Sequence, residues 1–151
     1  MNESKQHIAN EIKNYLNVNH SKMLQFLKKM VTMESPSNDK HALKTILQFI
    51  EGELVKLDFY SIRVSGKNTG GYLYARPKIR KKNKPIQIIV GHCDTVWDVS
   101  TINDIPITQR NGKITGPGVY DMKAGLTQIL FALRAIKDLS LSFGMTPIIF
   151  I

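Results

Sequence analysis

The stretch G-H-C-D-T-V … G-P-G-V-Y-D-M-K-A-G, which runs from Gly91 to Gly125, decides the fold. It directly follows the apolar run Ile86–Val90, which is typical of a strand buried on both faces. Alternate residues of an extended chain point to the same side, so His92 and Asp94 are expected to meet, with Cys93 turned away. An imidazole and a carboxylate are therefore predicted at the end of a strand, where open α/β sheets build their sites.

The second half of the stretch places another carboxylate near the first. Asp121 follows a loop with Gly116, Pro117 and Gly118, and it precedes a long segment of helical periodicity. Taken singly, Asp121 is also a good helix N-cap, and any sharp loop needs glycines. The loop is not the dinucleotide pattern G-x-G-x-x-G, because Asp121 replaces the last glycine.

Cys93 beside a histidine admits a thiol nucleophile as an alternative. On a strand, however, its side chain points away from His92, which favours a small buried residue. It is the single cysteine of the chain, so an intrachain disulfide is excluded.

Apolar periodicity along the rest of the chain predicts an α/β layer fold. Asn19 or Ser21 is expected to start the second piece of the first helix, and Asn38 or Asp39 to cap the next. Asn111-Gly112 is a strong hairpin signal. The expected elements are helices at 7–33 (in two pieces), 40–57 and 122–139, strands at 60–64, 72–75, 86–90 and 147–151, and a ribbon of 105–109 with 113–114.

Length and composition indicate one globular domain: 151 residues, 42% hydrophobic and 22% charged. The N-terminus M-N-E-S-K-Q-H is polar, with no apolar stretch typical of a signal peptide, and no apolar run is long enough to cross a bilayer. A cytoplasmic location without membrane contact is the expectation.

Part of the formal net charge of +9 lies in the basic run Lys78–Lys84. Such runs mark some nucleic-acid and membrane-surface patches. Pro77 and Pro85 bracket this one, and no aromatic residue is interleaved for base stacking. The pattern favours a solvated loop between two strands, and nucleic acid is not the expected partner.

Together, G-H-C-D-T-V and G-P-G-V-Y-D-M-K-A-G resemble the co-catalytic zinc carboxypeptidase, aminoacylase and deacylase superfamily, and within it the glutamate carboxypeptidase branch. The earlier E-S-P-S-N-D, Glu34–Asp39, is similar to the first loop of that superfamily. The resemblance implies a partial three-layer, zinc-exopeptidase-like catalytic domain with a mixed sheet. Residues 1–151 would be its N-terminal part, cut after the strand at 147–151, without the lid and dimerisation domain or the C-terminal part.

The same resemblance implies a site with two Zn²⁺ ions, with Co²⁺ or Mn²⁺ as other possible metals. His92 matches a ligand of one metal, and Asp121 matches the carboxylate that bridges both. Asp94 matches the catalytic carboxylate behind the histidine, which fixes its tautomer and raises its basicity. The family's general-base glutamate and its remaining ligands follow the strand that 147–151 resembles, outside these residues.

The implied activity is metal-dependent hydrolysis of a peptide or amide bond, with a peptide or N-acyl amino acid as substrate. This chain alone is expected to be inactive, and a homodimer is expected for a full-length form only. The alternatives are a degenerate fragment without catalysis and a basic nucleic-acid-binding module.

Three further expectations can be checked. The side chains of His92 and Asp121 should converge where the strand at 86–90 ends. The resemblance implies a cis peptide between Asp121 and Met122. The isolated chain should be aggregation-prone or molten, because the strand at 147–151 would have an incomplete neighbourhood.

Overall fold

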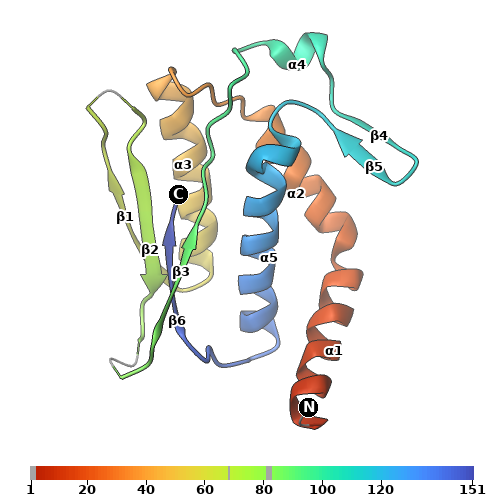
Figure 1. Cartoon of the computed structure of the whole chain (residues 1–151), viewed down its shortest axis with the longest axis vertical. Helices are drawn as coiled ribbons and strands as arrows, with labels where there is room; N and C mark the ends of the chain where they lie inside the picture. The colour runs from red at the N-terminus through yellow and green to blue at the C-terminus, as the bar shows by residue number, and fades with distance from the viewer. Residues whose placement is uncertain (1–2, 68, 81–82) are drawn as a thin grey trace.

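The fold is a mixed sheet with helices packed against one of its faces (Figure 1). The computed structural model describes residues 3–67, 69–80 and 83–151. The helical elements are α1 (Glu3–Val18), α2 (His20–Thr32), α3 (Lys40–Lys56), α4 (Thr101–Asp104), the irregular turn η1 (Val119–Lys123) and α5 (Ala124–Asp138), and the strands are β1 (Phe59–Val64), β2 (Tyr72–Pro77), β3 (Ile86–Val90), β4 (Thr108–Arg110), β5 (Lys113–Thr115) and β6 (Thr146–Phe150).

Four strands form the main sheet in the order β1-β2-β6-β3. β1 pairs antiparallel with β2, and β2 pairs antiparallel with β6. β3 lies parallel to β6, with Ile88 opposite Ile148 and Val90 opposite Phe150. The predicted mixed α/β sheet is therefore confirmed, and β6 occupies an interior position between β2 and β3.

The prediction that residues 86–90 are buried on both faces is wrong. β3 is an edge strand, and Ile86, Ile88 and Val90 are 57%, 64% and 69% exposed. The physical reason is that the helices cover only the other side of the sheet. We call the uncovered side the outer face; the register places on it Tyr60, Ile62, Val64, Tyr72, Tyr74, Arg76, Ile86, Ile88, Val90, Thr146, Ile148 and Phe150.

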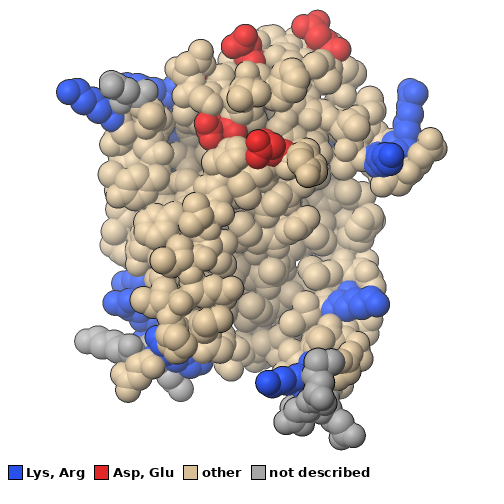
Figure 2. All heavy atoms as spheres, viewed as in Figure 1, with Lys and Arg blue, Asp and Glu red and all other residues tan. Residues whose placement is uncertain are grey.

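Figure 2 shows few charged side chains over β1, β2 and β3, and Lys and Arg lie toward the corners of the view. The outer face is therefore mostly apolar as well as uncovered; its one charged residue, Arg76, lies over the ring of Tyr60. Thr146 and Ile148 are the exceptions in exposure: both are buried although they belong to this face.

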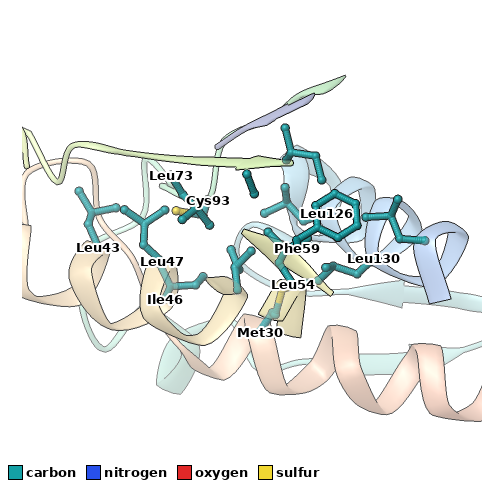
Figure 3. Packing of buried hydrophobic residues seen from close by; sticks show 14 residues of the cluster. Met30, Leu43, Ile46, Leu47, Leu54, Phe59, Leu73, Cys93, Leu126 and Leu130 are labelled. Atoms are coloured by element: carbon teal, nitrogen blue, oxygen red, sulfur yellow. The ribbon is translucent and has the colours of Figure 1, made fainter. Parts of the chain in front are cut away.

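The inner face of the sheet forms the hydrophobic core with α3 and α5 (Figure 3). The sheet contributes Phe59, Leu73, Ala75 and Ile149, each at most 2% exposed. The helical stripes that meet them are apolar at three- and four-residue intervals, as the sequence predicts; they comprise Met30, Leu43, Ile46, Leu47, Ile50, Leu54, Leu126, Leu130 and Leu133.

The local signals for helix starts and turns are largely confirmed. Asn19 directly precedes α2 as predicted, but its side chain makes no cap hydrogen bond and donates instead to the Tyr15 carbonyl. The carboxylate of Asp39 caps α3 by accepting from the backbone N–H groups of His41 and Ala42. The predicted ribbon forms from β4 and β5, with Asn111 and Gly112 both at positive φ, as a tight hairpin turn requires.

The basic run lies between β2 and β3, where a loop was predicted, although residues 81–82 fall outside the described part. Asn68, in the predicted turn of residues 66–71, also lies outside it. Among the described residues, no helix combines the length and apolar character that crossing a membrane requires.

Candidate metal-binding active site

The loop that leaves β3 carries His92 and Asp94 on one side and Cys93 on the other. The His92 Nδ1 atom lies 3.2 Å from Asp94 Oδ1 and 3.1 Å from the Asp94 carbonyl oxygen. The Cys93 side chain turns into the core and is 5% exposed. Burial raises the pKa of the Cys93 thiol to about 12, which leaves it protonated and a poor nucleophile. The prediction that His92 and Asp94 share one side of the chain and Cys93 faces the other is confirmed.

Asp121 lies in the irregular turn η1, and the alternative that it caps the following helix is wrong. α5 begins at Ala124 after Lys123, and Asp121 has extended backbone angles, φ −121° and ψ 98°. Its side chain is 78% exposed and turns toward the end of β3. The Asp121–Met122 peptide is cis, as the resemblance implies.

His92 and Asp121 converge, as predicted. The Nε2 atom of His92 lies 2.9 Å from Asp121 Oδ1. Partial burial lowers the pKa of the imidazole, but hydrogen bonds to Asp121 and Asp94, with the charges of both carboxylates, outweigh it and raise the pKa above its ordinary value. The imidazole thus has a carboxylate at each ring nitrogen.

The surroundings of this pair are open and acidic. Asp and Glu side chains gather in Figure 2 toward the end of the molecule where β3 leads to α4. A hollow of about 350 Å³ contains His92, Asp94 and Asp121, and its wall includes the side chains of Trp97 and Tyr120. Trp97 is 42% exposed and Tyr120 95%, so both present aromatic surface beside the carboxylates. Such a hollow suits a cation and a partly apolar ligand.

The donor set fits a divalent metal only in part. Imidazole nitrogen and carboxylate oxygen are ordinary zinc ligands, and Asp94 occupies the Nδ1 side so that Nε2 faces Asp121. Within residues 3–67, 69–80 and 83–151, no group of three or more His, Cys, Asp and Glu side chains is arranged to hold a metal ion. The assignment of His92 and Asp121 as metal ligands stays a prediction.

Sequence reasoning missed two residues that support the site. The Glu34 carboxylate accepts hydrogen bonds from the backbone N–H groups of Ser100 and Ile102, at 2.8 and 3.0 Å, and so fixes the start of α4. Lys123 is 1% exposed, and its Nζ donates to the carbonyl of Met33 at 2.9 Å. Burial lowers the pKa of Lys123 to about 8. A basic residue next to a helix start gives no sequence signal for burial.

Comparison with known proteins supports the resemblance. Residues 88–151 match the model of peptidase family M20/M25/M40. The predicted kinship with these peptidases is confirmed. The M20-matching segment begins within β3 and contains His92, Asp94 and Asp121.

Individual relatives extend the likeness to most of the chain. Carboxypeptidase G2 from Pseudomonas sp. (strain RS-16) is 27% identical over 135 residues, which is 85% of this chain and 31% of that protein. Human carnosine dipeptidase 1 superimposes with a TM-score of 0.81 at 17% identity, covering 93% of this chain and 33% of that one. The dipeptidase Dug1p from Saccharomyces cerevisiae superimposes with a TM-score of 0.78 at 16% identity, covering 93% of this chain and 33% of that one.

The two structural likenesses confirm the α/β fold class of the M20 catalytic domain. This chain spans about a third of the length of each of these relatives.

Proposed function

We propose that this chain supplies part of the metal site of an M20-type peptidase that hydrolyses a peptide or amide bond next to a free carboxylate. The observation that carries the proposal is the approach of His92 Nε2 to Asp121 Oδ1, 2.9 Å apart, with Asp94 behind the imidazole. The carboxypeptidase and dipeptidase names of the relatives favour this class of substrate.

The chain's own residues would each have a distinct task. Zn²⁺, or another divalent ion, supplies Lewis acidity and an acidified water when bound. His92 and Asp121 hold the ion, and Asp94 keeps the Nδ1–H of the histidine engaged so that the Nε2 lone pair faces outward. Trp97 and Tyr120 offer surface for the substrate side chain. Two protein donors are fewer than the three that a catalytic zinc site normally has, so the remaining donors and the general base have to come from other residues.

The proposal is tested by zinc calorimetry on the 151-residue chain, together with hydrolysis assays on a panel of dipeptides and N-acyl amino acids. Wild type is expected to bind zinc weakly and to turn over none of these substrates. His92→Ala and Asp121→Asn should each abolish the weak binding. His20→Ala, a histidine at the start of α2 and outside the site, is the matched control and should bind as wild type does.

Equal zinc affinity in wild type and His92→Ala would overturn the assignment of His92. Tight binding of two ions with turnover that His92→Ala abolishes would show that this chain completes its site some other way, for example from a partner chain. Loss of binding in His20→Ala alone would place the zinc elsewhere.

A further inference from the structure

The loop before α3 is fastened to the loop that carries the site. The backbone N–H of Thr95 donates to the Ser35 carbonyl at 2.8 Å, and the N–H of Ser37 donates to the Thr95 carbonyl at 3.0 Å. The buried Ser35 hydroxyl donates to the Cys93 carbonyl at 2.7 Å. Pro36 and Thr95 form a bridge between these hydrogen bonds. The position of Ser37 relative to Asp94 is thus set by backbone contacts on both sides.

Ser37 directs its hydroxyl at the carboxylate of Asp94. Its Oγ lies 2.6 Å from Asp94 Oδ2 and 3.2 Å from the Thr95 carbonyl oxygen. A serine hydroxyl has one proton to donate. The short contact to the charged acceptor is the stronger of the two, so the proton goes to Asp94.

The two oxygens of Asp94 are therefore divided between two donors. Oδ2 accepts from Ser37, and Oδ1 faces Nδ1 of His92 at 3.2 Å. The carbonyl oxygen of Asp94, 3.1 Å away, is a second acceptor for the same ring nitrogen. With two acceptors at Nδ1, the proton of the neutral imidazole belongs on Nδ1, which leaves a lone pair on Nε2.

Asp121 competes for that proton from the other side of the ring. Its Oδ1 lies 2.9 Å from Nε2, but the Asp121 side chain is 78% exposed and that of Asp94 is 40% exposed. Water therefore satisfies the Asp121 carboxylate more readily when it turns away from the imidazole. A carboxylate that Ser37 holds in place is the better acceptor because it loses less freedom on binding the ring N–H.

We infer that Ser37 is a positioning residue that selects the Nδ1–H tautomer of His92 by fixing the carboxylate of Asp94. The metal-binding consequence rests on the proposed function, whereas the tautomer is a property of the chain alone. The contact belongs to the loop E-S-P-S-N-D, whose likeness to a peptidase loop the sequence already indicated.

The test compares wild type, Ser37→Ala and Ser37→Thr by long-range ¹H–¹⁵N NMR of the histidine rings, at a pH where the imidazoles are neutral. All chains also carry Ile88→Lys, which adds charge to the outer face of the sheet and limits self-association. Wild type should show mainly the Nδ1–H form of His92. Ser37→Ala should lower the ratio of Nδ1–H to Nε2–H about fivefold, as expected for the loss of one hydrogen bond. Ser37→Thr keeps the hydroxyl and should restore the ratio.

Two controls separate positioning from loop stability. Ser142→Ala removes a serine that lines a different cavity from the one containing His92, and it should leave the ratio unchanged. Urea unfolding of each variant reports any general loss of stability, which by itself does not change a tautomer. An unchanged ratio in Ser37→Ala, or no recovery in Ser37→Thr, would overturn the inference.

Zinc calorimetry on the same variants distinguishes this inference from the proposed function. Ser37→Ala is expected to weaken binding about three- to tenfold, at or below the usual effect of a residue behind a metal ligand. A tautomer shift in a chain whose wild type binds no zinc would support the role of Ser37 and count against the metal site. Zinc binding that needs His92, without a tautomer shift in Ser37→Ala, would support the metal site and overturn the role of Ser37.

Discussion

The two faces of the main sheet both carry apolar side chains but differ in their environment. Ile149 on the inner face is 0% exposed and packs among side chains from α3 and α5. Ile88, on the outer face of the neighbouring strand, is 64% exposed. Both belong to apolar runs that predict buried strands. The difference shows that an apolar run identifies a strand but does not tell which layers cover it.

The largest expected effect is on the free energy of unfolding, when the same isoleucine-to-alanine substitution is made on each face. Ile149→Ala should lower the free energy of unfolding by about 2–5 kcal/mol, because it leaves a cavity in a packed core. Ile88→Ala should change it by less than about 1 kcal/mol, since most of that side chain already contacts water. Urea denaturation monitored by circular dichroism measures both values.

If the alanine variant does not fold, Ile149→Val keeps the comparison measurable. It should lower the free energy of unfolding by about 0.5–1.5 kcal/mol. Similar losses for Ile88→Ala and Ile149→Ala would mean that the outer face is covered in solution, for example by another copy of the chain.

A second prediction concerns that outer face directly. Exposed apolar surface on an edge strand promotes association, so the wild-type chain should self-associate at micromolar concentrations. Ile88→Lys combined with Ile62→Lys should weaken self-association at least about tenfold in sedimentation velocity, because it places two charges on this face.

The matched control for added charge is Val18→Lys, at an 83% exposed position at the end of α1. It should leave association close to that of wild type. An equal effect of Val18→Lys would mean that net charge, and not the outer face, governs association.

The smallest effect is expected at the periphery of the covered side, where α1 rests on α5. The Tyr15 hydroxyl donates to Asp138 Oδ2 at 2.5 Å. Burial and this hydrogen bond raise the pKa of Tyr15 to about 12 from its usual value near 10. The unfolded chain therefore ionises first, and the stability that the proton contributes below pH 10 is lost as the pH rises toward 12.

Tyr15→Phe should remove this part of the pH dependence. The urea midpoint of wild type should fall more steeply between about pH 9.5 and 11.5 than that of the variant, since only wild type carries the shifted group. Parallel curves would show that the Tyr15–Asp138 contact does not persist in solution.

Much of the fold was predictable because its signals are local. The apolar stripes of α3 and α5, the Asp39 cap and the Asn111-Gly112 turn each depend on residues close in sequence. The convergence of His92 and Asp121 was also predictable, because one follows a strand and the other precedes a helix in a recognisable pair of motifs.

What the sequence did not predict depends on distant partners. The exposure of β3 follows from its edge position beside β6, which no local pattern encodes. Asp121 is not a helix cap because an irregular turn intervenes before Ala124. The burial of Lys123 depends on a carbonyl group of Met33, 90 residues away in sequence.

The interior place of β6 also has a consequence for how the protein is made. As the chain emerges from a ribosome, β1 and β2 can pair at once, because residues 59–64 and 72–77 form a local ladder. β3 emerges next, but its hydrogen-bonding partner is β6, and the backbone N–H of Gly91 donates to the Phe150 carbonyl at 2.9 Å. Non-local pairing of this kind is slow and leaves strand edges open meanwhile. His92 is thus translated well before the strand that holds its loop in place.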